Sequence, residues 1–307
     1  MNLASNEPAR TRIGESEALP PITEVAEQPD FDAPLLLGRY QPLQLLARGS
    51  SSMVFRARDE TLGRNVAIKH FDGFSAEDVV AFHDEVRTLA SLSHHGIVAI
   101  NDAGTDLSSP DEPHPFLVME FVRGKSLRET MAARRLSTVE IGELGFEVVE
   151  ALEYVHAQGV IHRDISPSNI MIVEYGTSSS RPRARLTDFG IAIAVGTRQE
   201  PGAPTLGTAA YLSPEQTTGE PLTPASDIYS LGLVLLECFT QERAFPGEAV
   251  ESALIRRDFD PPIPTSVPSA WRAIIEQMTS RAPADRPTAA ELARSIRLAL
   301  RNSGRHM

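Results

Sequence analysis

Two short polar motifs constrain this chain more than any other feature: residues 162–169 (HRDISPSN) and residues 188–190 (DFG). Within them, Asp164, Asn169 and Asp188 supply two carboxylates and one amide oxygen. A carboxylate can orient an attacking hydroxyl group, and Mg²⁺ on a triphosphate prefers oxygen ligands such as the other two. The motifs together therefore predict a site of phosphoryl transfer. The alternative is a chance surface turn followed by a chance strand end, which the order of the two motifs disfavours.

The composition argues against several classes of protein. With 307 residues and 41% hydrophobic content, the chain can form one large domain or two lobes. Its formal net charge of -12 argues against a nucleic-acid binder and against an anionic membrane surface as partner. The longest apolar run, residues 231–236, is far shorter than the ~20 residues of a membrane helix, so we expect no membrane span. The single cysteine cannot form an intramolecular disulfide, which favours a reducing compartment and a cytoplasmic location.

The ends of the chain and one histidine pair have plain interpretations. Residues 1–36 are acidic, contain prolines and have few large apolar groups, so we expect a disordered leader. Residues 301–307 are expected to form a short tail.

Neighbouring His94 and His95 suggest a metal site, but no third ligand has a suitable spacing. We therefore interpret this pair as loop residues.

One helix of the predicted first lobe can be recognised from its pattern alone. Ser75 and Asp78 form a capping-box pattern, and apolar residues then recur at helical spacing up to Leu89. Glu85 lies beside this apolar face. Taken alone, Glu85 and Lys69, a lysine at the end of the preceding predicted strand, would be interpreted as two solvated charges.

The two polar motifs resemble the catalytic loop and the Asp-Phe-Gly motif of the eukaryotic-type (Hanks-type) protein kinases, most like the bacterial Ser/Thr protein kinases. Residues 66–69 (VAIK), 207–215 (GTAAYLSPE) and 281–287 (RAPADRP) resemble further motifs of that family, in its order. The resemblance covers roughly residues 38–300. It implies an α+β, bilobal protein-kinase-like fold. The small lobe, residues 37–122, would be an antiparallel β-sheet with one helix, and the larger lobe, residues 123–300, would be mainly helical.

The resemblance also implies a role for each of five side chains. Asp164 would orient the acceptor hydroxyl, and Asn169 with Asp188 would hold Mg²⁺, or Mn²⁺ as an alternative. Lys69, oriented by Glu85, would position the phosphates of ATP. Transfer to a protein Ser/Thr hydroxyl would then rest on positioning and charge neutralisation. A protein substrate is the implied partner.

The resemblance further implies three structural supports in the larger lobe. Asp227 would brace the backbone of the catalytic loop from below, and Arg286 would form an ion pair with Glu215.

A nucleotide pocket between the lobes follows from the same resemblance. Met119 would lie at its back, and the backbone of Glu120 and Val122 would face the adenine edge. The remaining implied contacts are Ala47, Gly49 and Ser52 in the glycine-rich loop, and Val54, Ala67 and Met171 around the ring. Each apolar residue of this set is equally explained as core if no nucleotide binds.

Two departures from the family leave alternatives open. Ser166 stands where Ser/Thr protein kinases usually carry a lysine, and Gly49 alone remains of the three loop glycines. Losing one electrostatic contact of this kind could cost about 10²–10³ in rate. A pseudokinase scaffold, with weak or no catalysis, is therefore the main alternative, and a small-molecule phosphotransferase is a second one.

The segment between the Asp-Phe-Gly motif and residue 206 occupies the place of a kinase activation segment. Thr197 and Thr205 are its candidate phosphate acceptors, and Arg163 could bind a phosphate placed there. We expect the chain to phosphorylate this segment itself, which would require self-association.

Overall fold

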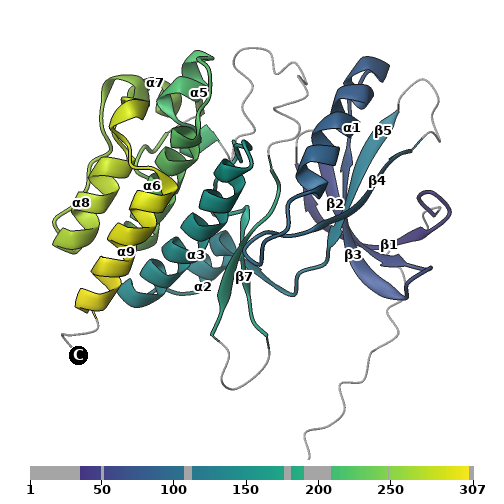
Figure 1. The fold of residues 1–307 in the computed structure, drawn as a ribbon, viewed down its shortest axis with the longest axis horizontal. Coiled ribbons are helices and arrows are strands. Elements are labelled where there is room, and N and C mark those ends of the chain that lie inside the picture. Colours follow the sequence, from purple (N-terminus) through teal and green to yellow (C-terminus); the bar gives the residue numbers. More distant parts are fainter. Residues whose placement is uncertain are drawn as a thin grey trace, which may run out of the picture.

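The computed structural model describes residues 35–49, 52–106, 113–175, 181–189, 209–247 and 249–303. The expected leader lies outside the described residues except for its last two, of which Leu36 forms an isolated bridge with Tyr40. The described chain folds into two lobes, one mainly sheet and the other mainly helix (Figure 1). This arrangement confirms the expected bilobal α+β fold.

The small lobe is a five-stranded antiparallel sheet accompanied by one helix, α1 (Ala76–Ala90). The strand order is β1-β2-β3-β5-β4, with β1 (Tyr40–Arg48), β2 (Ser52–Asp59), β3 (Arg64–Phe71), β4 (Ile100–Asp106) and β5 (His114–Glu120). At the start of α1, Ser75 and Asp78 form the expected reciprocal capping box. The box satisfies backbone N–H groups that a helix start otherwise leaves without a partner.

The two faces of this sheet have different surroundings, because successive side chains point to opposite faces. Ile68 and Val118 belong to a small apolar cluster on one face. Leu117 belongs to the main core, which extends from the other face into the large lobe. By this alternation Lys69 faces the large lobe, whereas His70 lies on the far face.

The large lobe surrounds a short three-stranded sheet with helices. The sheet order is β6-β7-β8, with β6 (Gly124–Ser126), β7 (Ile170–Val173) and β8 (Arg183–Leu186). The helices are α2 (Leu127–Ala133), α3 (Thr138–Ala157), α5 (Pro214–Thr218), α6 (Pro224–Thr240), α7 (Ala249–Asp258), α8 (Ser269–Met278) and α9 (Ala289–Ser303), with single 3₁₀ turns at Ala209–Tyr211 and Pro283–Asp285. None of the helices in the described part of the chain is long and apolar enough to cross a membrane.

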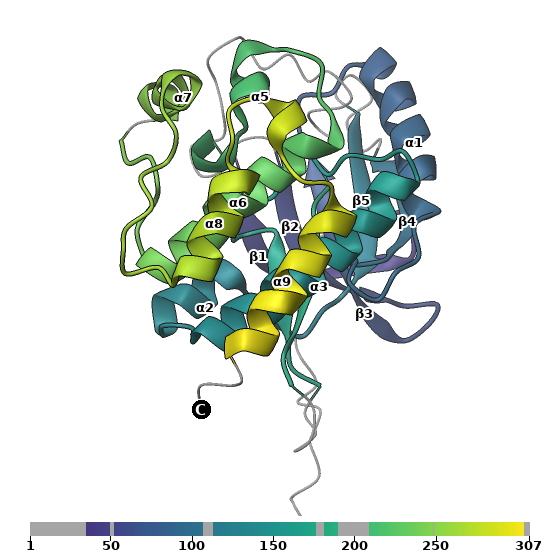
Figure 2. The same cartoon turned by 60° about the vertical axis from the view of Figure 1, so that its left-hand side comes forward.

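Helix α6 forms the centre of the large lobe, and almost all of its side chains are buried. Helix α9 packs along α3, and the two lie side by side in both views (Figures 1 and 2). This contact is close at Gly142 of α3, where an added Cβ would lie 2.5 Å from a Leu300 methyl carbon and 2.8 Å from the Trp271 ring. A larger residue at Gly142 would therefore push α3 away from α8 and α9.

A short backbone connection joins the two lobes directly beside the predicted site. The N–H of Val98 donates to the carbonyl of Leu186 at 2.8 Å, and the N–H of Leu186 donates to the carbonyl of Gly96 at 2.8 Å. Leu186 ends β8, two residues before Asp188. The loop around His94 and His95 is therefore fixed to the strand that leads into the Asp-Phe-Gly motif.

Candidate active site

The catalytic loop is anchored from below by one buried carboxylate on α6. Asp227, 1% exposed, accepts hydrogen bonds from the backbone N–H of His162 at 2.8 Å and of Arg163 at 2.9 Å. The Nε2 atom of His156 lies 2.8 Å from the same carboxylate. Because hydrogen bonds to a buried charge are strong, they fix the backbone immediately before Asp164.

His162 joins the two motifs and is fully buried. Its Nε2 atom lies 3.1 Å from the Thr187 carbonyl oxygen, and its Nδ1 atom lies 3.3 Å from the N–H of Asp164. Burial lowers the pKa of His162, which favours the neutral ring. A neutral ring with its proton on Nε2 satisfies both contacts, donating to Thr187 and accepting from Asp164. The Phe189 ring packs against the same ring in a tilted arrangement, with 4.5 Å between centroids.

Asn169 lies against Asp164 at the centre of the site. Its Nδ2 donates to the Asp164 carbonyl at 2.9 Å and to Asp164 Oδ2 at 2.8 Å. The carbonyl of Asn169 accepts from the N–H of Thr187 at 3.0 Å, which brings the residue before Asp188 next to it. The two motifs therefore meet at Asn169, whose side chain contacts Asp164 and whose backbone contacts the residue before Asp188.

Both motifs contain a backbone conformation that ordinary residues rarely adopt. Arg163 has φ 69° and Asp188 has φ 58°, in the left-handed region that favours glycine. Among the described residues other than glycine, Leu37 and Gln241 alone share a positive φ. Such strain persists where the surrounding structure fixes it, and it is concentrated at functional sites.

Lys69 and Glu85, the two charged residues expected to position the phosphates of ATP, form ion pairs with other partners than each other. Lys69 Nζ lies 2.9 Å from Asp188 Oδ1, and both side chains are about one-fifth exposed. Glu85 Oε1 instead lies 3.6 Å from Arg163 Nη1. The expected pair between Lys69 and Glu85 is thus not formed, because each partner is nearer to an opposite charge supplied by the large lobe.

A pocket lies beside this ion pair and extends between the strands of the small lobe. Its lining residues are Lys69, Phe71, Val98, Ile100, Leu117, Met119, Asp188 and Phe189. Met119 is 6% exposed and pairs in register with Ala67 across β3 and β5. Of the residues expected around the nucleotide base, Met119 alone belongs to this lining.

The other residues that the sequence places around the nucleotide lie on or next to the strands of the two lobes. Val54 pairs with Lys69 across β2 and β3, and Met171 lies on β7 opposite Ser126. The N–H of Glu120 donates to the Ala99 carbonyl at 2.9 Å. The side chains of Val54, Ala67, Glu120, Val122 and Met171 are all partly exposed.

The hairpin between β1 and β2, at the position of a glycine-rich loop, has a backbone hydrogen bond across its turn. The N–H of Gly49 donates to the carbonyl of Ser52 at 2.7 Å, and Ala47 pairs with Val54. The Gly49 N–H therefore already has a backbone acceptor. Ala47 and Ser52 flank the turn, as expected from their sequence positions.

Ser166 is 3% exposed, and its carbonyl accepts from the N–H of Asn169 at 3.0 Å. This position lies inside the catalytic loop. A lysine at this buried position would have to extend its side chain outward to place its charge in solvent. The candidate acceptors Thr197 and Thr205, together with Gly190 and Thr208, lie outside the described residues.

The expected supporting ion pair of the large lobe is formed and deeply buried. Arg286 donates to Glu215 through two bonds of 2.7 and 2.9 Å, and both side chains are at most 3% exposed. Ser226 also donates to Glu215, at 2.6 Å. Burial by itself raises the pKa of Glu215, but the hydrogen bonds from Arg286 and Ser226 outweigh it, and the pKa is lowered.

Two supports of the site were missed from the sequence. Gln216 Nε2 donates to the Arg163 carbonyl at 2.8 Å, next to Asp164. Arg256, fully buried on α7, donates to the carbonyl oxygens of Ala209 at 2.6 Å and Leu212 at 2.8 Å. Burial lowers the pKa of Arg256 to about 10, which leaves it charged at pH 7. No motif or periodicity marks either residue.

Comparison with known proteins agrees with this geometry. Residues 40–296 match the family model described as "Protein kinase domain". The chain belongs to the protein kinase family. It is 35% identical over 260 residues to serine/threonine-protein kinase PknA of Mycobacterium tuberculosis, covering 82% of this chain and 58% of that protein.

Two further bacterial relatives are similar to this kinase domain. Serine/threonine-protein kinase PknB of Mycobacterium tuberculosis is 37% identical over 238 residues, covering 75% of this chain and 37% of that protein. A Streptomyces coelicolor protein described as a probable serine/threonine-protein kinase is 38% identical over 219 residues, covering 69% of this chain and 32% of that protein. The chain thus spans little more than half of PknA, and less of the other two.

Proposed function

We propose that this chain is the catalytic domain of an ATP-dependent serine/threonine protein kinase that transfers the γ-phosphate of ATP to protein hydroxyl groups in bacterial signalling. The observation that carries the proposal is the position of Asp164. It lies between the Asp227-anchored backbone and Asn169, beside the strand end that holds Asp188. The names of the relatives, all described as serine/threonine-protein kinases, support the same activity.

In this proposal Asp164 orients the acceptor hydroxyl and receives its hydrogen bond. Asn169 donates its amide N–H to Asp164, which turns its oxygen away from that carboxylate. The oxygens of Asn169 and Asp188 fit a hard divalent cation such as Mg²⁺, with Mn²⁺ as an alternative. When bound, the cation would neutralise charge on the phosphates of ATP.

Binding of ATP and a cation would require Lys69 and Glu85 to change their ion-pair partners. Asp188 Oδ1 now accepts from Lys69 at 2.9 Å, and a cation held by this carboxylate would compete with that bond. We propose that Lys69 then turns to the phosphates and to Glu85, while Glu85 leaves Arg163. This exchange should cost little free energy, because the side chains of both present ion pairs are partly exposed.

The nucleotide base would lie between the lobes, against Val54, Ala67, Met119 and Met171. Since the N–H of Glu120 is already bonded to Ala99, the proposed adenine contacts use the Glu120 carbonyl and the backbone of Val122. This placement gives the base a hydrophobic slot and a polar edge, which is the usual make-up of small-molecule sites.

Several finer points stay predictions. The acceptor is a protein Ser or Thr, self-association would serve autophosphorylation, and Thr197 and Thr205 are the candidate sites. The cytoplasmic location, which the single cysteine favours, is also a prediction.

The proposal is tested by phosphate transfer from labelled ATP with Mg²⁺, to the protein itself and to a generic basic protein. Asp164→Asn should lower transfer by about 10²–10⁴-fold, since it removes the group that orients the hydroxyl. Asp260→Asn is the matched control, because this exposed carboxylate lies in the same lobe and pairs only with Arg281 among described residues.

Three results would contradict the proposal. Equal transfer by the Asp164→Asn variant would mean that Asp164 is not the orienting group. Bound ATP without transfer, in a folded protein, would favour the scaffold alternative and make Ser166 the first residue to change. Transfer to a small molecule but to no protein would favour the small-molecule phosphotransferase.

A further inference from the structure

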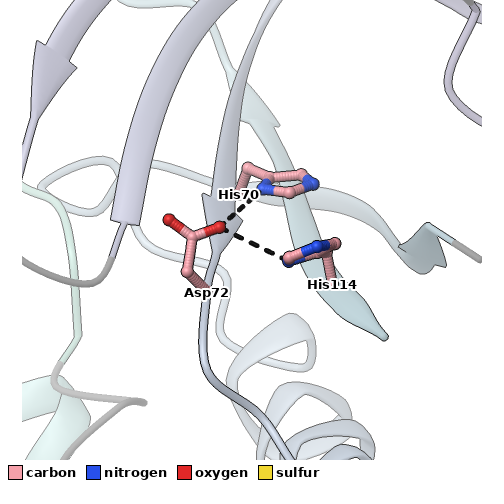
Figure 3. Close-up of side chains that lie close together, drawn as sticks. All are labelled: His70, Asp72 and His114. Atoms are coloured by element: carbon pink, nitrogen blue, oxygen red, sulfur yellow. Dashed lines mark ion pairs between the residues drawn. The ribbon is translucent and has the colours of Figure 1, made fainter. Parts of the chain in front are cut away.

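Three side chains that the kinase chemistry does not use meet on the far face of the small-lobe sheet. His70 is near the end of β3, Asp72 follows it by two residues, and His114 is the first residue of β5 (Figure 3). Their ligand atoms all lie within 4.8 Å of one another. Within the described ranges, no other group of three or more His, Cys, Asp or Glu residues is so arranged.

The distances in this cluster are those of ligands around a small cation. Asp72 Oδ1 lies 3.4 Å from His114 Nδ1 and 3.7 Å from His70 Nδ1 (Figure 3). Both separations exceed the 2.7–3.2 Å range of an ordinary hydrogen bond. Two metal bonds of about 2.1 Å in tetrahedral geometry place their ligand atoms roughly 3.4 Å apart. A cation between these three atoms would need only small side-chain shifts.

The two nitrogen atoms that face Asp72 are buried and make no hydrogen bond within the described part of the chain. The Nδ1 atoms of His70 and His114 have no hydrogen-bond partner among the residues that the structure describes. Such buried polar atoms are uncommon in folded proteins and call for an explanation such as an ion. The two rings also lie close together, 5.0 Å between centroids.

The outer nitrogen of His70 lies near a second carboxylate. Its Nε2 atom lies 3.9 Å from Asp106 Oδ2, on β4, which pairs with the far edge of β5. A histidine that binds a metal usually has a carboxylate near its second nitrogen, which orients the ring. Burial, followed by the proximity of His114, lowers the pKa of His70 and so favours the neutral ring.

We propose that His70, Asp72 and His114 bind a divalent transition-metal cation of the zinc class, at a site separate from the nucleotide. Two imidazoles and one carboxylate suit Zn²⁺ and its neighbours, whereas Mg²⁺ prefers oxygen ligands alone. Asp72 is 46% exposed, so the cation can reach the site from solvent. The fourth coordination position would be taken by water. The bound cation would tie the end of β3 and the start of β5 to the segment that leads into α1.

The test is titration of the nucleotide-free protein with Zn²⁺, followed by calorimetry and by thermal unfolding. The expected result is one saturable site that raises Tm, with Mg²⁺ giving no comparable effect. Asp72→Asn and His114→Gln should each weaken Zn²⁺ binding at least tenfold, since even outer partners of a metal typically cost 10–100-fold. Asp72→Asn changes an exposed carboxylate to a side chain of equal size, so the fold should persist.

Two control variants locate the site. His95→Ala removes an exposed histidine outside the cluster, and Asp188→Asn removes a carboxylate of the nucleotide site. Both should retain the Zn²⁺ affinity of the original protein. The proposal would be overturned by the absence of saturable Zn²⁺ binding, or by equal binding in the Asp72→Asn and His114→Gln variants.

Discussion

The two halves of the active site are held in different ways. On the large-lobe side, buried groups fix the catalytic loop: Asp227 is 1% exposed and bonds two consecutive N–H groups. On the small-lobe side, Lys69 and Glu85 each meet a partner that the sequence did not predict, and all the side chains concerned are partly exposed. The difference indicates a fixed half that orients the acceptor hydroxyl and an adjustable half that responds to the nucleotide.

The largest expected effect concerns the fixed half. Replacing Arg286 with Met leaves Glu215 charged and buried without its partner, which should lower the free energy of unfolding by about 3–5 kcal/mol. Denaturant unfolding at pH 7 measures this loss. The double variant with Glu215→Leu should lose much less than the Arg286→Met variant alone. Equal losses in the two variants would contradict the assignment of the effect to an unpaired buried charge.

The same pair predicts a pH dependence with a defined sign. In the original protein the pKa of Glu215 is below its ordinary value of 4.5, so its contribution is complete above about pH 4.5. That contribution is lost as the pH falls through the lower, folded-state pKa. In the Arg286→Met variant burial would raise the pKa instead, and acid would relieve the penalty. The stability difference between the two proteins should therefore shrink from pH 7 to pH 4, as measured by unfolding at each pH.

Asp227→Asn should also damage the fixed half. The amide keeps the shape of the side chain but turns an N–H donor toward backbone donors, at a cost of about 3 kcal/mol in unfolding free energy. Because a misplacement of about 1 Å can cost 10²-fold in rate, phosphate transfer should fall by about that factor. Transfer at the original rate in a folded variant would show that the Asp227 contacts do not position Asp164.

Ser166→Lys should raise the transfer rate, by up to about 10²-fold, if the missing lysine limits charge stabilisation at the phosphate. Ser166 is 3% exposed, so the lysine chain must turn outward toward the space between the lobes. The measurement is the transfer rate at saturating ATP, with Ser168→Lys as a control at the neighbouring exposed position. An unchanged rate with an intact fold would remove Ser166 as the limiting feature.

Glu85→Gln should have the smallest effect on stability, below about 1 kcal/mol, because the pair with Arg163 is 3.6 Å long and partly exposed. Its effect on phosphate transfer should be larger, since the proposed role of Glu85 is to orient Lys69 once nucleotide is bound. Denaturant unfolding and transfer assays on the same preparation separate the two quantities. A stability loss of several kcal/mol would show that Glu85 belongs to the fixed half.

The sequence predicted the fixed half because its contacts follow from motifs at set positions. Asp227 and the pair of Glu215 with Arg286 lie where the resemblance implied, and the capping box at Ser75 follows from local hydrogen bonding. Asp227, Glu215 and Arg286 are buried, so an alternative arrangement of these three would leave a charge or a donor without a partner.

The ion pairs of the adjustable half, the contacts of Arg256 and the cluster around His114 could not be predicted from the sequence, and each failure has a physical reason. A motif places Lys69, Glu85 and Asp188 in one site, but partly exposed ion pairs differ by little in free energy, so it does not decide which charges pair. Arg256 donates to carbonyl groups of Ala209 and Leu212, more than 40 residues earlier, and no local pattern records that contact. The cluster around His114 similarly depends on strand pairing across the sheet.

Whether Lys69 exchanges Asp188 for the phosphates is decided by a structure with Mg²⁺ and a non-hydrolysable ATP analogue. We predict a cation within about 2.0–2.1 Å of oxygens from both Asn169 and Asp188, and a Lys69 Nζ that has left Asp188 for the phosphates and Glu85. A bound nucleotide with the 2.9 Å pair between Lys69 and Asp188 still intact, and no cation at Asn169, would contradict the account.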